Sequence, residues 1–376
     1  SVTISSSLLV SISEQELIEI GSKLWRESIS NNFQVNSKHL VPISGGLDSR
    51  ATLAGLLEHT EAKNIHTYTF GTPNTLDYDV GNYIAKKLGT NHTSFDLTKY
   101  AYKQEELENI SKRIHHQAVL FHHWPVWELD ALFKGCIQWS GFMGDPLAGS
   151  HLSSSQSHNL EEAKTNFIKK NKYVKSIKLS NNDDFSSLIN NDLIDKDKLT
   201  LDEQLDFQNR QTKYISSIVL MKGYDLKTPF LYQPYIDFML SVDNKHRINQ
   251  NLYKKILLNA FPKEFSYKTK TNFGLPLGAS NNAVFINRVK NKILRMIGLS
   301  KGIGINYLDF NEKIRTKKDL RDVISMNILD LKRRDIIDWI DIEKILNDHL
   351  SNKGNFADAL IVLASLEIHL KAGKVL

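Results

Sequence analysis

The chain has 376 residues, 41% of them hydrophobic, and carries a formal net charge of +6. This length fits one large domain or two closely packed ones, and the composition is ample for a buried core. The charge is mild for a chain of this size, so it gives no reason to expect a nucleic-acid partner.

Signals for membranes and secretion are missing from the sequence. No apolar run approaches the roughly 20 residues of a membrane span, and the N-terminus shows no basic-then-apolar signal segment. The single cysteine, Cys136, rules out disulfides within the chain and favours a reducing compartment. We therefore expect a cytoplasmic protein that does not contact membranes.

The first predicted element is a helix near the N-terminus. Ser13 and Glu16 have the spacing of a capping box, and Leu17, Ile20 and Leu24 then recur at helical spacing. This pattern predicts a structural helix that ends at about Ile29.

The most informative stretch is a glycine turn between a strand and a helix. Residues 40–43 are apolar and predict a buried strand, two glycines follow, and residues 47–57 have helical spacing. Such a turn presents unpaired N–H groups and the positive end of a helix dipole, which suits a phosphate. The candidate cofactor-binding residues of this turn are Ile43, Ser44, Gly45, Gly46, Leu47, Asp48 and Ser49.

Asp48 distinguishes this turn from an ordinary strand–turn–helix junction with serine caps. A carboxylate repels phosphate unless a cation lies between them, so Asp48 is a candidate Mg²⁺ ligand. The turn matches neither the Walker A pattern, because it lacks Gly-Lys-Ser/Thr, nor Gly-x-Gly-x-x-Gly.

Strand and helix patterns alternate after this turn. They predict a strand at 65–71, a helix at 80–88 and a short strand at 92–97. The alternation is typical of an α/β fold with a doubly wound parallel sheet, whose ligands bind beyond the carboxyl ends of the strands. That rule places Phe70 and Gly71 beside Ser44 over one crevice, which makes them candidate ligand-binding residues.

A second glycine-rich turn follows a helix predicted at 125–133 and a strand predicted at 136–139. It begins Ser140-Gly141-Phe142-Met143-Gly144-Asp145. Taken alone, Asp145 is most simply a turn residue. Beside the first turn it becomes a second candidate Mg²⁺ ligand, because Mg²⁺ on nucleotide phosphates takes one or two carboxylates.

The remaining chain divides by composition. Residues 150–202 are rich in Ser, Asn, Lys and Asp, with a helix predicted at 160–170 and surface loops at 153–157 and 181–187. The rest has a mostly helical pattern without a detectable repeat. We therefore expect a leading helix at 1–30, a nucleotide-binding core at 31–150 and a mainly helical part at 151–376.

The turn at residues 44–49 resembles the Ser-Gly-Gly-x-Asp-Ser loop of the ATP pyrophosphatase (PP-loop) superfamily. Most of the chain resembles the synthetase domain of the asparagine synthetase family, with motifs in the family's order. Residues 69–71 stand where the family's second strand meets adenine, and residues 140–145 correspond to the family's Ser-Gly-Glu-Gly-x-Asp motif. Residues 221–231 correspond to the motif Met-x-x-Gly-x-Glu-x-Arg-x-Pro-Phe-Leu, and residues 252–258 to the helix that follows it. Residues 268–274 correspond to a loop with the motif Arg-x-Lys.

The resemblance implies ATP and Mg²⁺ as cofactors. It adds Ser140 and Gly141 to the nucleotide site and assigns a catalytic lysine, for which Lys270 is the first candidate and Lys254 the second. It also implies a two-step reaction, in which a carboxylate attacks ATP to give an acyl-adenylate and pyrophosphate, and an amine then displaces AMP.

The sequence departs from the family pattern at three points. Ser1 opens the chain where the family usually has a glutaminase domain with an N-terminal cysteine, so we expect no ammonia production from glutamine by that route. Phe142 replaces the glutamate of Ser-Gly-Glu-Gly, a position where related β-lactam synthetases carry tyrosine. Lys227 and Tyr232 replace the arginine and aspartate that flank Pro-Phe-Leu.

The resemblance therefore implies an amide-forming ligase for a small-molecule or peptide carboxylate. The amine would be free ammonia, ammonia from a separate glutaminase, or an amine within the substrate. Two alternatives stay open: a tRNA-modifying PP-loop ligase of the lysidine-forming kind, against which the mild charge argues, and a degenerate nucleotide-binding or scaffold subunit.

The base that deprotonates the amine is not evident from the sequence. His115, His116, His122 and His123 form two pairs, and a neutral histidine could serve. Surface or loop histidines explain these pairs more simply.

Overall fold

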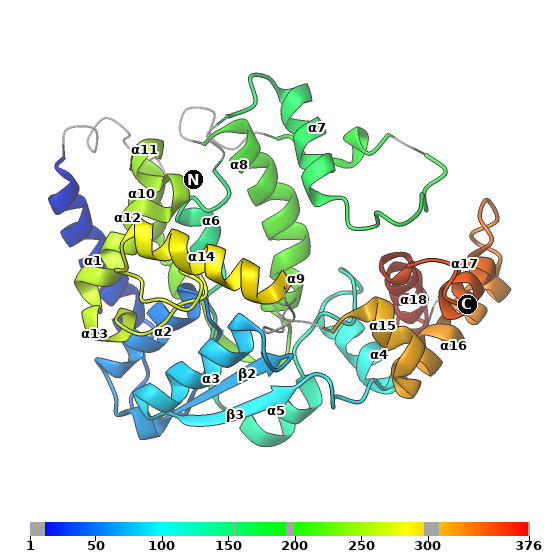
Figure 1. Ribbon diagram of the computed structural model, residues 1–376, viewed down its shortest axis with the longest axis horizontal. Helices are drawn as coiled ribbons and strands as arrows, with labels where there is room; N and C mark the ends of the chain where they lie inside the picture. Colours follow the sequence, from blue (N-terminus) through cyan, green and yellow to red (C-terminus); the bar gives the residue numbers. More distant parts are fainter. Residues whose placement is uncertain (1–11, 153–154, 183, 193–198, 297–307, 375–376) are drawn as a thin grey trace.

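The computed structural model describes residues 12–152, 155–182, 184–192, 199–296 and 308–374 (Figure 1). Its centre is a parallel sheet in the order β3-β2-β1-β4-β5. The strands are β1 (His39–Pro42), β2 (Ile65–Gly71), β3 (Asn91–Asp96), β4 (Ile137–Trp139) and β5 (Asp225–Lys227). Helices flank this sheet, which confirms the doubly wound α/β class.

One face of the sheet packs against helices from two separate parts of the chain, residues 14–88 and residues 233–260. The helices that share this core are α1 (Glu14–Ser30), α2 (Asp48–Leu57), α3 (Leu76–Leu88), α10 (Gln233–Ser241) and α12 (Asn251–Ala260). The predicted capping box of α1 is present, because the Ser13 and Glu16 side chains each bond the other's backbone N–H. The left-handed Gly89 (φ 77°) ends α3.

The second core joins the other face of the sheet to a helical lobe. Its helices are α4 (Gln104–Arg113), α5 (Val126–Phe133), α15 (Phe310–Thr316), α16 (Lys318–Arg334), α17 (Ile342–Leu350) and α18 (Ala357–Ala372). Adjacent residues of β1 show the division between the cores, since Leu40 belongs to this core and Val41 to the first.

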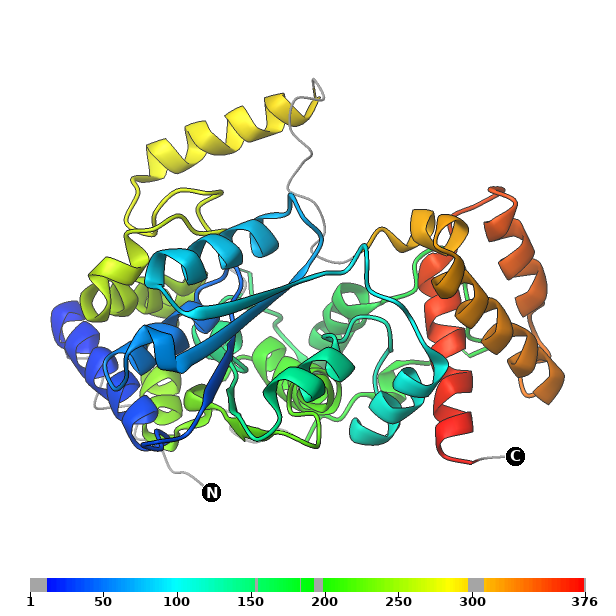
Figure 2. The ribbon, with the colours of Figure 1, turned by 90° about the horizontal axis from the view of Figure 1, so that it is seen from below.

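The other helices lie in the chain between β4 and α15. They include α6 (Gly144–Leu147), α7 (Leu160–Asn171), α8 (Leu201–Leu205), a π-helix (Asp206–Ile215), α9 (Ser216–Val219), α11 (Asn244–Arg247), α13 (Pro262–Phe265) and α14 (Asn281–Met296). Figure 2 shows α14 standing apart from the sheet. The C-terminal half also supplies β5, although its sequence pattern predicts helices almost throughout.

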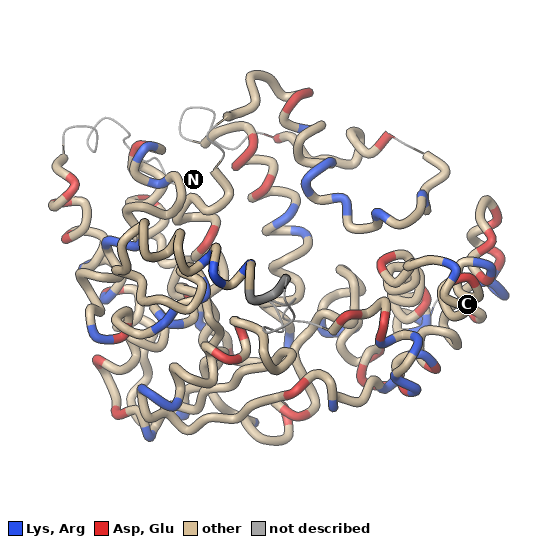
Figure 3. The backbone as a smooth tube through the Cα atoms, in the orientation of Figure 1, with Lys and Arg blue, Asp and Glu red and all other residues tan. Residues whose placement is uncertain are grey.

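Charged residues of both signs are interspersed along the described chain, apart from a mainly basic stretch at and after α7 (Figure 3). None of the described helices is both long and apolar enough to cross a membrane. Of the surface loop predicted at 153–157, residues 153–154 lie outside the described residues, as does Ser1.

Candidate active site

The first glycine turn lies where the strand order of the sheet reverses. Between β1 and β4 the connections change direction, and at such a point the carboxyl ends of the strands leave a crevice. The turn is held by its own serines, because Ser49 Oγ accepts from Ser44 N at 3.2 Å and Ser44 Oγ accepts from Gly46 N at 3.2 Å. Helix α2 begins directly afterwards, so the positive end of its dipole faces the crevice.

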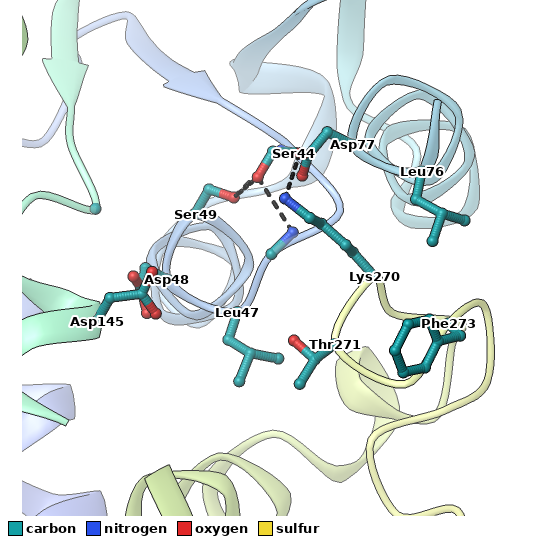
Figure 4. A pocket seen from close by; sticks show the side chains of 12 residues that line it. Ser44, Leu47, Asp48, Ser49, Leu76, Asp77, Asp145, Lys270, Thr271 and Phe273 are labelled. Atoms are coloured by element: carbon teal, nitrogen blue, oxygen red, sulfur yellow. Dashed lines mark hydrogen bonds and ion pairs between the residues drawn. The ribbon is translucent and has the colours of Figure 1, made fainter. Parts of the chain in front are cut away.

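A cavity of about 520 Å³, here called the loop cavity, opens beside this turn (Figure 4). Three further segments complete its wall, from the start of α3, the second glycine turn and the loop after α13. The lining residues are Ser44, Gly46, Leu47, Asp48, Ser49, Leu76, Asp77, Gly141, Asp145, Lys270, Thr271 and Phe273. The structure therefore gathers most of the sequence-predicted site residues around one space.

The other sequence-predicted residues lie behind this wall or away from it. The Ile43 carbonyl accepts from the Thr69 hydroxyl at 2.6 Å, and the Gly45 carbonyl accepts from Lys270 N at 2.8 Å. Phe70 and Gly71 end β2 and do not line the loop cavity. Lys254 also lies outside the lining, and its Nζ donates to the Asn249 carbonyl at 2.7 Å.

Asp48 and Asp145 lie side by side in the wall of the loop cavity (Figure 4). Each accepts a hydrogen bond from a neutral side chain: Tyr253 Oη donates to Asp48 Oδ1 at 2.9 Å, and Gln250 Nε2 donates to Asp145 Oδ1 at 2.8 Å. Neither carboxylate forms an ion pair with a lysine, arginine or histidine of the described residues. Burial, and then the negative charge of Asp145, raise the pKa of Asp48 well above its ordinary value.

The donor chemistry of this pair fits Mg²⁺. The available ligands are carboxylate oxygens, without nitrogen or sulfur, as a hard cation prefers. The described residues contain no group of three or more His, Cys, Asp and Glu side chains that could hold a metal. A cation here would therefore need further oxygen ligands from a bound substrate, as Mg²⁺ on nucleotide phosphates does.

Gly144 allows the second turn to pack against the Asp48 carboxylate. A Cβ built on Gly144 would lie 2.3 Å from Asp48 Cγ and 2.6 Å from both carboxylate oxygens. Real side chains cannot approach so closely, so any residue with a Cβ here would displace the Asp48 carboxylate. The second turn thus needs a glycine at this position for packing.

Lys270 reaches the rim of the loop cavity from the loop after α13. Its backbone is fixed to the first turn through the Gly45 carbonyl, and its ammonium pairs with Asp77 at the start of α3. The side chain is 49% exposed, so the ion pair with Asp77 is weak and can be exchanged for a ligand. Asp77 is a lining residue that sequence reasoning missed.

A second cavity of about 340 Å³, here called the helix cavity, lies on the other side of the carboxylate pair. Asp48, Gly141 and Asp145 belong to both cavities. The rest of its wall comes from the second turn, the π-helix and α9; its residues are Ser140, Phe142, Met143, Gly144, Pro146, His151, Arg210, Gln211, Ile215 and Val219. The two cavities therefore meet at the predicted metal ligands.

The helix cavity contains a histidine–carboxylate pair that the sequence did not reveal. His151 Nδ1 lies 2.8 Å from Asp206 Oδ2, and Gln211 Nε2 donates to the same oxygen at 2.9 Å. Burial raises the pKa of Asp206, but the hydrogen bonds from His151 and Gln211 outweigh it, and the pKa lies below its ordinary value. The π-helix brings Asp206 and Gln211, five residues apart, onto one face.

The histidines that the sequence suggested as bases lie elsewhere. Burial lowers the pKa of His122 and of His123 to about 4, and neither lines the loop cavity or the helix cavity. His115 and His116 follow α4 with φ of 57° and 56° and also line neither cavity. The simpler interpretation as surface or loop histidines fits this placement, because His115 and His116 are exposed and His122 and His123 lie in a loop, where His123 is buried.

The family model described as asparagine synthase matches residues 24–120. The match covers β1, the first glycine turn, α2, β2, α3, β3 and α4, and it confirms the family resemblance over that segment. No curated protein matches the chain significantly. The motifs after residue 120, including Asp145 and Lys270, lie outside the match and stay predictions.

Proposed function

We propose, from the match of residues 24–120 to the synthetase domain of the asparagine synthase family, that this chain is an ATP-dependent carbon–nitrogen ligase. It adenylates a substrate carboxylate with release of pyrophosphate and then transfers the acyl group to ammonia or an amine. The observation that carries the proposal is the meeting of the loop cavity and the helix cavity at Asp48 and Asp145. One cavity then takes ATP and the other takes the acid.

The loop cavity suits the phosphates of ATP. The amides of the first turn and the start of α2 offer donors and positive potential, and Lys270 offers a full positive charge at the rim. Mg²⁺ held by Asp48 and Asp145 would neutralise charge on the phosphates. Phe70, at the end of β2, is the predicted neighbour of adenine.

The helix cavity suits the acid. Arg210 lines it and forms no ion pair or hydrogen bond with another described residue, so its guanidinium can attract a carboxylate. Phe142 lines the same cavity, and an aromatic ring there avoids the negative charge that the family's glutamate would place beside an anionic substrate. The apolar Ile215 and Val219 complete a surface for the substrate's carbon skeleton.

We propose that the cysteine of this chain does not generate the amine. Cys136 is 8% exposed and directly precedes β4. It therefore lies at the amino ends of the strands, whereas the crevice lies at their carboxyl ends. We propose free ammonia, a separate glutaminase or an amine of the substrate as the source.

Whether tRNA is the substrate is tested by salt-dependent tRNA binding, which the proposal predicts to be absent.

The first prediction is that the purified chain cleaves ATP between the α and β phosphates. With Mg²⁺ and a panel of candidate acids, the correct acid should support exchange of labelled pyrophosphate into ATP and, with amine, yield AMP and pyrophosphate in equal amounts. Reactions without acid are the control. Formation of ADP and orthophosphate without AMP would refute the proposal, and ATP binding without any turnover would favour the degenerate-subunit alternative.

The second prediction concerns the packing of Gly144 against Asp48. Gly144→Ala should lower the exchange rate about 100-fold, because displacing a reacting group by about 1 Å can cost that much. Gly278→Ala is the matched control, since its added Cβ would meet only Leu258 at 3.7 Å. Initial rates at saturating ATP measure the effect, and equal rates in the two variants would contradict it.

A further inference from the structure

We infer that His151, oriented by Asp206, is the general base that takes the proton from the attacking amine in the second half of the proposed reaction. The inference rests on the proposed function, which leaves this role unfilled because Phe142 provides no proton acceptor. It assigns the role to a pair of side chains that lie 55 residues apart and meet only in the folded chain.

The position of His151 fits this role. It follows the second glycine turn and lines the helix cavity together with Asp48 and Asp145, so it faces the space where the activated acyl group would lie. It also lines a neighbouring cavity of about 390 Å³, whose wall includes Asn166, Lys170 and Asp202. An amine that enters through this neighbouring cavity would pass the imidazole before it reaches the acyl carbon.

The hydrogen bonding of His151 sets the tautomer that a base requires. Nδ1 lies 2.8 Å from Asp206 Oδ2. Nδ1 therefore carries the proton and donates a hydrogen bond to the carboxylate, which leaves Nε2 with a lone pair. Nε2 forms no hydrogen bond with another described residue. Asp206 would also stabilise the imidazolium that forms, as in other histidine–carboxylate pairs.

Asp206 is itself well fixed for this purpose. Its side chain is 6% exposed, and Gln211 donates to the oxygen that faces His151. The further charged groups around the pair are Arg210, Asp48 and Asp145 in the helix cavity, and Lys170 and Asp202 in the neighbouring cavity. The carboxylates favour a positive imidazolium and the two cations oppose it.

The nitrogen lone pair of a neutral amine forms the C–N bond to the acyl carbon of the acyl-adenylate, and the carbonyl π electrons move to oxygen. The proton of the attacking nitrogen passes to His151 Nε2. The carbonyl re-forms as the bond from the acyl carbon to the phosphate oxygen breaks, and AMP leaves with that electron pair.

The test separates the two half-reactions in the full chain, with the acid that supports pyrophosphate exchange and with ammonium chloride as the amine source. His151→Gln should keep exchange within about threefold of wild type, while amide formation falls 10²–10⁴-fold, the usual contribution of a positioned base. Asp206→Asn should show the same split. His158→Gln is the matched control, because His158 is exposed on the same segment and lines neither cavity.

Two further measurements distinguish a base from a structural residue. At constant free ammonia, the pH profile of amide formation should differ between the wild type and His151→Gln, whereas the two pH profiles of pyrophosphate exchange should coincide. Added imidazole should restore amide formation to His151→Ala at least tenfold.

Amide formation in His151→Gln that matches wild type would overturn this inference alone. A parallel loss of exchange and amide formation would also overturn it, because His151 would then serve the fold or the first step. An absence of exchange in the wild-type chain would instead overturn the proposed function, and this inference with it.

Discussion

Asp48→Asn and Asp145→Asn are each expected to lower the rate of acid-dependent pyrophosphate exchange about 10³-fold. The pair supplies the two carboxylates that would hold Mg²⁺, and no other carboxylate lines the wall that both cavities share. Loss of one electrostatic partner of a reacting phosphate costs roughly 10²–10³ in rate, and weaker cation binding adds to that cost. Asp322→Asn, on the exposed surface of α16, is the control.

The free energy of unfolding of Asp48→Asn should equal or exceed that of the wild type, although its exchange rate falls. The pKa of Asp48 lies well above its ordinary value because of burial and the charge of Asp145. A carboxyl with a raised pKa in the folded state binds its proton more tightly there than in the unfolded chain. Its ionisation therefore weakens the fold as the pH rises through the ordinary aspartate pKa towards the folded pKa. At neutral pH without Mg²⁺, the neutral asparagine removes this cost.

The measurements are exchange kinetics across a Mg²⁺ series and thermal unfolding with and without Mg²⁺. We expect Asp48→Asn to melt at the wild-type temperature or above without Mg²⁺, and to gain less than the wild type when Mg²⁺ and ATP are added. Near-normal exchange at limiting Mg²⁺ would rule out the substituted residue as a ligand. An inactive Asp48→Asn chain that melts well below wild type would assign Asp48 a structural role instead.

The sequence could predict those parts of the site whose pattern lies within a short segment of the chain. A strand, two glycines and a helix define the first turn within a dozen residues, and the topology of a parallel sheet then brings the turn with Asp145 beside it. Both inferences need only the order of strands and helices. The predicted strand at 65–71 matches β2 for the same reason, since its signal lies within its own residues.

The parts that the sequence could not predict depend on distant contacts. His151 and Asp206 meet across 55 residues, and the π-helix that carries Asp206 has no recognisable period in the sequence because its side chains do not recur at the usual helical spacing. Strand β5 has three residues, too few for a pattern. The neighbours of Asp48 illustrate the same limit, because Tyr253 is a helical residue whose hydroxyl reaches the carboxylate only in the folded chain.

Lys270→Ala is expected to lose kcat about 10²–10³-fold while the KM for ATP changes little. The backbone of Lys270 is tied to the first turn through Gly45, whereas its ammonium is half-exposed and paired with Asp77 at the rim of the loop cavity. A side chain that must leave Asp77 to meet the reacting phosphate stabilises charge that develops in the transition state more than charge already present on bound ATP. Lys270→Arg should also be poor, because a planar fork does not replace a point charge.

The steady-state kinetics of two further variants should be measured beside those of Lys270→Ala. Asp77→Asn removes the partner that holds Lys270 away from ATP, so it should keep kcat within about tenfold of wild type if the ion pair is only a resting contact. Lys254→Ala should behave like wild type, because the Lys254 ammonium is bound to the Asn249 carbonyl and lines neither cavity. Wild-type kinetics in Lys270→Ala combined with a collapse in Lys254→Ala would move the catalytic role to α12.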